Sequence, residues 1–268
     1  MSTLKQSFRL QWKIIASEQG VQLLVCGDGP LLILIPGMEG SGESCIELAE
    51  WLIEESVRSG IGLQIILVDY KKEVSNSLDA LTTLLEKILQ QHLKGPVIIW
   101  SQSFGNVIAT RILSRKNIKI NKHLLMSPFV KIPKIKLFFG MIIMRWTPRA
   151  WYRRFTPGIS RWFFGPMPKV HPFLDVLACE DPKNYCRRIS WLFNISLSEQ
   201  FSYSTFPRAV WIGKDDKLIN PIAQINFFKT NQGDAAMEIK VLKNTGHMLF
   251  PEIIGKEYCL QLLTWLQA

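Results

Sequence analysis

The sequence predicts an α/β fold in which a mostly parallel central sheet has helices on both sides. Short, continuous apolar segments alternate with longer segments whose apolar residues recur every three or four positions. Continuous apolar strands are typical of a sheet covered on both faces, and this alternation is typical of parallel strands joined by helices. The alternation is interrupted between residues 128 and 206, which indicates an insertion in the fold.

The expected elements follow one another along the chain. Turn residues at Gly20 and around Gly29 divide residues 8–36 into an antiparallel hairpin followed by a buried strand. The segment Ser44-Cys45-Ile46-Glu47 has the pattern of a helix capping box. We expect further strands at 63–68, 97–100, 124–126, 209–212 and 237–242, and helices at 46–57, 78–88, after 103, from 221 and at 254–265.

Length and composition indicate one large domain rather than a membrane-spanning chain. The 268 residues are 47% hydrophobic, yet no apolar segment approaches the ~20 residues that cross a bilayer. The first 13 residues lack the apolar segment of a signal peptide, so we expect a cytoplasmic protein. The five cysteines and four histidines are scattered without ligand spacing, so we expect no metal site and no cofactor.

The segment Ser101-Gln102-Ser103-Phe104-Gly105 joins a predicted strand to a predicted helix. Small residues two positions before and after Ser103 permit a very tight turn, which would hold this serine in a strained conformation with its hydroxyl exposed. We expect a side chain at Gly105 to collide with the strand that enters the turn. The helix that follows would direct the N–H of Phe104 toward an oxyanion formed at Ser103. Alternatively, Ser103 is only the N-cap of a buried helix.

Four segments, in this order, resemble the α/β-hydrolase family across nearly all of the chain outside the insertion. The segment around Ser103 resembles the G-x-S-x-G nucleophile elbow, with Ser101 in place of the first glycine. Residues 213–216 resemble the acid loop and point to Asp216, and residues 244–247 resemble the histidine loop at His247. Residues 35–38 resemble the oxyanion loop, with Pro36 in place of its histidine.

The resemblance implies a catalytic triad of Ser103, His247 and Asp216, in the chain order expected for this fold. His247 would take the proton from the Ser103 hydroxyl during attack, and Asp216 would hold the imidazole in the useful tautomer. The backbone N–H groups of Met38 and Phe104 would stabilise the oxyanion. Taken singly, the acidic, glycine and histidine residues also have ordinary interpretations as turn or surface residues. For His92, His123 and His171 we expect structural or surface roles.

The insertion is basic and aromatic. Residues 131–188 contain twelve lysines and arginines against three acidic residues, so they contribute +9 of the formal net charge of +10. The family resemblance places a cap over the active site here. One interpretation is a lid that binds an apolar acyl group or the surface of an anionic membrane. The other is a helical cap that packs on the core while its arginines extend to water. No nucleic-acid recognition motif accompanies the charge.

These observations predict an α/β-hydrolase core of residues 1–127 and 207–268, with a mainly helical cap of residues 128–206. The expected activity is hydrolysis of a carboxylic ester or thioester with an apolar acyl group, through an acyl-enzyme on a small, lipid-like substrate. An acyltransferase that uses the same triad is an alternative. A protein that keeps the fold only to bind a ligand or dock on a membrane is another.

Overall fold

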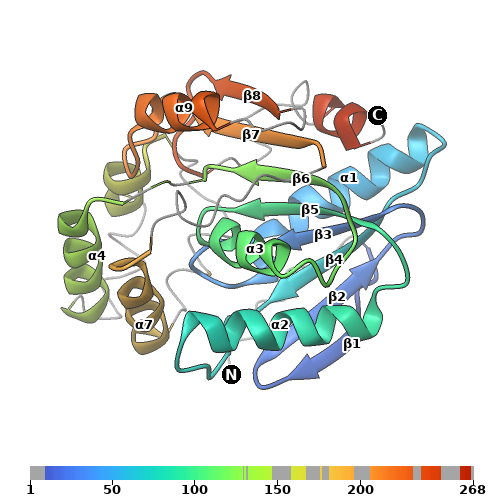
Figure 1. Cartoon of the computed structure of the whole chain (residues 1–268), viewed down its shortest axis with the longest axis horizontal. Helices are drawn as coiled ribbons and strands as arrows, with labels where there is room; N and C mark the ends of the chain where they lie inside the picture. The colour runs from blue at the N-terminus through green and yellow to red at the C-terminus, as the bar shows by residue number, and fades with distance from the viewer. Residues whose placement is uncertain are drawn as a thin grey trace.

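A computed structural model of the chain describes residues 10–128, 130, 132–146, 158–166, 176, 181–195, 206–231, 237–248 and 260–266. Its centre is an eight-stranded sheet in the order β1-β2-β4-β3-β5-β6-β7-β8 (Figure 1). Only β1 and β2 run antiparallel to their neighbours; every other pairing is parallel. The strands are β1 (Lys13–Glu18), β2 (Val21–Cys26), β3 (Leu31–Ile35), β4 (Gln64–Asp69), β5 (Val97–Gln102), β6 (Ile120–Met126), β7 (Arg208–Gly213) and β8 (Met237–Leu242).

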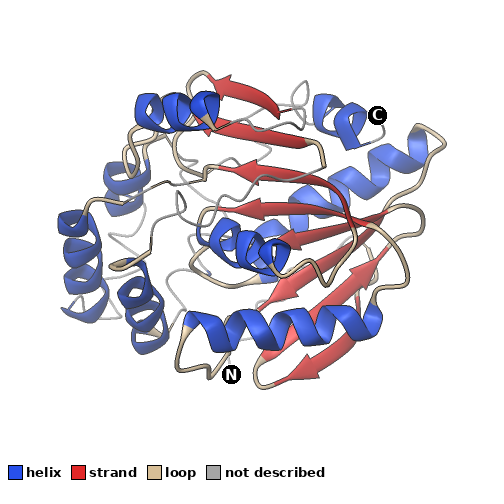
Figure 2. Ribbon diagram, viewed as in Figure 1, coloured by secondary structure: helices blue, strands red, loops and turns tan. Residues whose placement is uncertain are grey.

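Helices cover both faces of this sheet, as the alternation of apolar segments predicts (Figure 2). Helices α2 (Leu78–His92), α3 (Phe104–Ser114) and α9 (Pro221–Thr230) pack on one face, and α1 (Ile46–Arg58) packs on the other with the helical residues 260–266. Alternate residues of a strand enter opposite cores: Ile33 and Ile99 face α2 and α3, whereas Leu32 and Ile98 face α1. Burial on both faces explains why these strands are continuously apolar.

The chain between β6 and β7 contains three described helical segments of more than one residue. These are α4 (Lys134–Trp146), residues 158–164 and α7 (Pro182–Leu192). Helices α4 and α7 pack against each other and lie beyond the carboxyl ends of the central strands (Figure 1). Their residues Leu137, Met144 and Ile189 join the same apolar core as α2 and α3. Among the described residues, no helix is long and apolar enough to cross a membrane.

The capping prediction at Ser44 is wrong. Residues Gly42–Cys45 form a short 3₁₀-helix, and Cys45 is the N-cap of α1 without a side-chain capping bond. The Ser44 hydroxyl instead donates 2.7 Å to a carboxylate oxygen of buried Glu39, with the Ser41 carbonyl 2.8 Å away. A buried carboxylate without donors is costly, so the tertiary contact takes the hydroxyl away from the helix end. By contrast, Asn220 caps α9, which begins at the expected residue 221, and its side chain accepts from two backbone N–H groups.

Candidate active site

The turn that carries Ser103 lies at the carboxyl end of β5, in the middle of the sheet, where parallel α/β folds place their ligands. Ser103 has φ +50° and ψ −116°, the strained conformation that its small neighbours predict. It is the residue before α3, so the Phe104 N–H is the first donor of the helix.

Gly105 allows this turn through a contact that differs from the expected one. A Cβ at Gly105 would lie 2.4 Å from the carbonyl oxygen of Pro36 and 2.5 Å from that of Ile35. The collision is therefore with the end of neighbouring strand β3, and not with β5, which enters the turn. The glycine brings α3 against the loop that carries Met38.

Gly105→Ala is expected to lower the free energy of unfolding by about 2–3 kcal/mol, because the backbone of β3 must move to admit the methyl group. Urea unfolding measures this change. Gly95→Ala is the matched control, since a Cβ there meets no heavy atom within 4 Å, and it should change stability by less than about 0.5 kcal/mol. Equal stability of the two variants would contradict the close approach at Gly105.

Ser103, His247 and Asp216 form a chain of hydrogen bonds. Ser103 Oγ lies 2.7 Å from His247 Nε2, and His247 Nδ1 lies 2.7 Å from Asp216 Oδ2. The other carboxylate oxygen of Asp216 accepts from the backbone N–H groups of Leu218 and Ile219, at 2.8 and 3.0 Å. A carboxylate held in this way accepts a hydrogen bond from Nδ1–H and leaves Nε2 free to accept the proton of Ser103.

The chain between β6 and β7 contacts the histidine directly. The Phe164 ring stacks on the His247 ring at a centroid distance of 5.9 Å, and the Phe164 carbonyl accepts the backbone N–H of His247 at 2.6 Å. A Cβ at Gly165 would lie 2.4 Å from the carbonyl of Asp215, so the two loops touch. Sequence reasoning did not predict the contact of Phe164 with His247, because Phe164 lies among many aromatic residues and nothing near it in the sequence indicates which residue it contacts.

Ser101, which replaces the usual glycine, belongs to a buried polar network. Asn106 Nδ2 donates to the carbonyls of Ser103 and Met126 at 3.1 and 3.0 Å, so Asn106 Oδ1 accepts from Ser101 Oγ at 2.7 Å. That bond uses the only proton of the Ser101 hydroxyl. His123 Nε2, 2.8 Å away, must therefore donate to Ser101. The network runs from His123 through Ser101 and Asn106 to the carbonyl of Ser103, and it holds the backbone of the turn in place.

His123 has a structural place in this network, one of the roles expected for it. Burial, reinforced by the nearby charge of Arg208, lowers the pKa of His123 to about 3. His92 is exposed at the end of α2, and His171 lies outside the described residues. Among the residues that the structure describes, no cluster of three or more His, Cys, Asp or Glu side chains could hold a metal ion.

Acid should destabilise the protein through His123. An unfolded chain protonates this histidine near pH 6.5, whereas the folded protein keeps it neutral down to about pH 3. Stability from this residue is therefore present above about pH 6.5 and lost as the pH falls toward 3, by up to about 1.4 kcal/mol per pH unit. His123→Gln should flatten the pH dependence of urea unfolding between about pH 7 and 5, while exposed His92→Gln should leave it unchanged. An unaltered slope in His123→Gln would count against this account.

The Met38 loop is held by buried polar groups. Glu39 accepts the Gly37 N–H at 3.2 Å as well as the Ser44 hydroxyl, and burial raises the pKa of its carboxyl. Tyr70, at the end of β4, directs its hydroxyl at the carbonyls of Pro36 and Gly37, and the Gly37 carbonyl also accepts the Gly40 N–H at 3.0 Å. These contacts hold the peptide before Met38 in one orientation.

Comparison with solved structures identifies the architecture. An esterase from Exiguobacterium antarcticum superimposes with a TM-score of 0.75 at 15% identity, over 96% of this chain and 100% of the other. A bromoperoxidase from Bacillus anthracis gives 0.75 at 16% identity, over 92% and 96% of the two chains. The chain has the α/β-hydrolase fold. A carboxylesterase from Bacillus subtilis gives 0.68 at 13% identity, over 98% and 93%.

The sequence comparisons agree with this fold. A family model described as serine aminopeptidase, S33, matches residues 58–171 of this α/β-hydrolase-fold protein, a range that includes the Ser103 turn. No curated protein matches the sequence. At identities of 13–16%, the solved structures establish the fold of this chain.

Proposed function

We propose that this α/β-hydrolase-fold protein is a serine hydrolase that cleaves a carboxylic ester or thioester with an apolar acyl group. The observation that carries the proposal is the hydrogen-bonded chain from Ser103 Oγ through His247 to the Asp216 carboxylate, at the carboxyl end of a central strand. A serine hydroxyl is a weak nucleophile, and a neutral imidazole at 2.7 Å is the base that activates it. Burial of all three side chains limits competing contacts with water.

In the first half of the reaction, Ser103 Oγ attacks the carbonyl carbon while His247 Nε2 takes its proton. The carbonyl oxygen becomes an oxyanion, which the N–H groups of Met38 and Phe104 bind. When the tetrahedral intermediate collapses, the bond to the leaving alcohol or thiol breaks and that group takes the proton from His247. The products of this half are the free alcohol or thiol and an ester between Ser103 and the acyl group.

In the second half, a water molecule gives a proton to His247 Nε2 and its oxygen attacks the acyl carbon. Collapse of this intermediate releases the carboxylic acid and returns the proton to Ser103. Asp216 remains ionised and stabilises the imidazolium in both halves. An apolar acyl group is supported by the Phe164 ring on His247 and by the buried apolar residues of α4 and α7 beyond the strand ends. A lipid-like ester is the substrate class that fits these surroundings.

A fluorophosphonate probe tests the nucleophile. We expect stoichiometric labelling of Ser103, located by peptide mass spectrometry, no labelling of Ser103→Ala, and slow labelling of His247→Ala. Labelling of a different serine, or no labelling of the intact protein, would contradict the proposal; the second result would favour a fold kept only for binding.

The substrate class is tested separately with p-nitrophenyl esters and acyl thioesters of graded chain length. We expect kcat/KM to rise from acetate toward longer acyl chains, because each buried methylene adds about 0.8 kcal/mol of apolar contact. Equal kcat/KM for all chain lengths would contradict the proposed specificity for an apolar acyl group, but it would not contradict the assignment of Ser103 as the nucleophile. The same reactions with added alcohols separate hydrolysis from acyl transfer, since a transferase would yield a new ester in place of free acid.

A further inference from the structure

Helix α4 carries a row of large apolar side chains on its outer side. Ile135, Phe138, Phe139, Ile142 and Trp146 follow one another at the spacing of a single helix face, and each is between 37% and 75% exposed. This row, here called the α4 face, contains five of the exposed large hydrophobic residues of the described chain. Isolated exposed apolar residues are ordinary, whereas a contiguous row marks a surface that has a partner.

The opposite side of α4 is already packed. Leu137 and Met144 are buried, α4 packs on α7, and the Cys186 thiol lies 3.7 Å from the carbonyl of Met141. The α4 face is therefore not the side of α4 that packs on α7 and the core. A helix that is apolar on both sides fits a position between protein and a second apolar medium.

Charge identifies that medium. Helix α4 carries Lys134, Lys136 and Arg145 and no acidic residue, within a segment that contributes +9 to the net charge. Lys134 and Arg145 are exposed near the two ends of the helix. A second copy of this chain would bring like charge against like charge, whereas an anionic lipid surface offers acyl chains to the aromatics and headgroups to the cations.

We propose that the α4 face docks this protein on an anionic lipid surface, with α4 lying in the headgroup region. The geometry gives the docking a direction. Helix α4 follows the carboxyl end of β6, and Ser103 follows the carboxyl end of its parallel neighbour β5. Docking through α4 therefore brings to the lipid the end of the sheet at which Ser103 lies.

Vesicle sedimentation of the full chain tests this surface. We expect binding to phosphatidylcholine vesicles with about 30% phosphatidylserine to be at least about tenfold tighter than to pure phosphatidylcholine, and to weaken as salt increases. Phe138→Ser with Phe139→Ser should reduce it at least about tenfold. Ile222→Ser with Val74→Ser should not, although these two residues are more exposed than the phenylalanines and lie elsewhere on the surface. Equal binding to both vesicle types, or equal losses in both double variants, would overturn the proposal. The proposal would also be overturned if the intact protein formed a dimer and did not bind vesicles, and the Phe138→Ser, Phe139→Ser variant were a monomer.

A second observation concerns the buried arginine of α7. The Arg188 side chain is fully buried, and its guanidinium binds four backbone carbonyls. Nη1 donates to Met38 and Glu39 at 2.9 and 3.2 Å, and Nη2 donates to Tyr70 and Lys71 at 2.8 and 2.9 Å. A buried cation is costly unless its donors are used, so these bonds strongly favour one position of the loop that carries Met38.

The contacts also set the direction of the Met38 N–H. The Gly37 carbonyl is bound by the Tyr70 hydroxyl and the Gly40 N–H. In a trans peptide the N–H of Met38 points opposite to the Gly37 carbonyl. Arg188 lies over the Tyr70 ring, 5.3 Å from its centroid, and binds the next carbonyl, that of Met38. The peptide before Met38 is thus held by Tyr70 and Gly40, and the peptide after it is held by Arg188.

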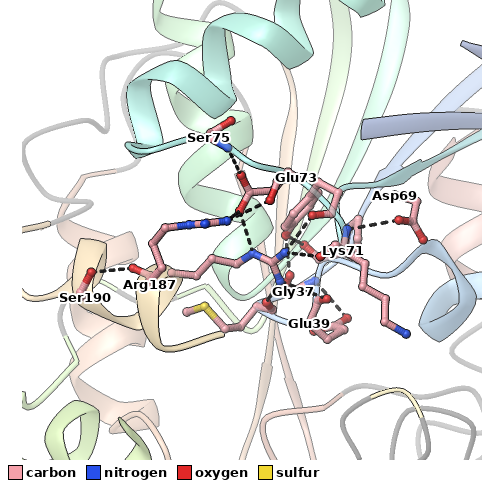
Figure 3. Close-up of polar contacts among 12 residues, drawn as sticks. Gly37, Glu39, Asp69, Lys71, Glu73, Ser75, Arg187 and Ser190 are labelled. Carbon is pink, nitrogen blue, oxygen red and sulfur yellow. Dashed lines mark hydrogen bonds and ion pairs between the residues drawn. The ribbon is translucent and has the colours of Figure 1, made fainter. Parts of the chain in front are cut away.

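The neighbouring arginine provides a natural comparison. Arg187 Nη2 donates to the carbonyl of Glu73 at 2.9 Å and to its carboxylate at 2.7 Å, and Arg188 Nε lies 3.4 Å from the same carboxylate oxygen. Figure 3 shows Glu73 between Ser75 and Arg187, with Gly37 and Glu39 on the other side of the cluster. Arg187 thus shares Glu73 with Arg188, and the two hydrogen bonds that its Nη2 donates both go to Glu73.

We propose that Arg188 is a positioning residue for the oxyanion donor at Met38, so that the seating of α7 and the oxyanion hole are linked. This inference rests on the proposed function. Arg188→Met should lower kcat for a short-chain ester about 10²-fold with KM within about threefold, as expected when one oxyanion donor is misplaced. Arg188→Lys should recover part of the loss, and Arg187→Met should keep kcat within about threefold.

Active-site titration with the fluorophosphonate corrects these rates for the folded fraction. A purely structural role would lower the titrated fraction or the thermal midpoint and leave kcat per labelled site unchanged, which would overturn the inference. Equal losses of kcat in the Arg187 and Arg188 variants would do the same. If Arg188→Met does not fold, kcat per labelled site is compared between Arg188→Lys and Arg187→Met. A lower kcat in Arg188→Lys supports the inference, and equal values overturn it. An intact protein that neither turns over esters nor labels at Ser103 would instead refute the proposed function.

Discussion

Replacing Ser103 by alanine is expected to reduce kcat for the preferred ester by about 10⁶-fold, the loss seen when a triad nucleophile is removed. The reason is that Ser103 Oγ lies 2.7 Å from His247 Nε2, and no other hydroxyl of the described residues forms a hydrogen bond with this imidazole. Steady-state kinetics with a long-chain ester measures the effect. Thermal unfolding should be nearly unchanged, because alanine can occupy the same backbone position with a smaller side chain.

The control for this prediction lies on α3, the helix that follows Ser103. Ser114 is exposed on α3 and its hydroxyl donates to the Arg111 carbonyl. Ser114→Ala should keep kcat within about twofold. Turnover by Ser103→Ala at more than about a hundredth of the normal rate would show that another group attacks the ester.

Replacing Asp216 by asparagine is expected to reduce kcat by about 10⁴-fold through the wrong histidine tautomer. The backbone N–H groups of Leu218 and Ile219 bind Oδ1, so the asparagine oxygen must face them and its NH₂ must face His247 Nδ1. His247 Nδ1 then accepts, and its proton moves to Nε2, which can no longer take the proton of Ser103. Steady-state kinetics on the same ester measures the loss, and KM should change little.

Asp215→Asn is the matched control, because Asp215 is the adjacent exposed carboxylate. In the described part of the chain, its backbone N–H is bound by the Thr245 carbonyl and its carboxylate has no hydrogen-bond partner. It should retain kcat within about threefold. Equal losses in both variants would indicate disruption of the loop. A fall of less than about tenfold in Asp216→Asn would show that the carboxylate does not select the tautomer.

Local patterns in the sequence predicted the core of the fold well. Strands such as β5 and helices such as α2 and α9 arise from apolar spacing and caps within a few residues, and these signals survive in the folded chain. The spacing of Ser103 from Gly105 likewise predicted a tight, strained turn, because that strain depends on the residues of the turn itself. The capping pattern at Ser44 failed where a buried carboxylate, Glu39, competed for the same hydroxyl.

Contacts between distant segments had no comparable signal. Ser101 looked like a small substitute for glycine, yet it accepts a hydrogen bond from buried His123 and supports the turn. Arg188 was one of twelve basic residues in a charged segment, and nothing in its neighbours distinguished it from Arg187. Its bond to the Met38 carbonyl joins residues 150 positions apart.

The sequence by itself determined the order of strands and helices and the serine turn, because periodicity and turn chemistry act over short distances. Its resemblance to the α/β-hydrolase family pointed to Asp216 and His247 as the partners of Ser103. Only the tertiary structure decided that Ser103, His247 and Asp216 share one line of hydrogen bonds. It also decided that Arg188 meets the Met38 loop and that α4 keeps an apolar face outside. Hydrogen bonds and exposure depend on which distant segments meet in space, and that depends on the packing of the whole chain.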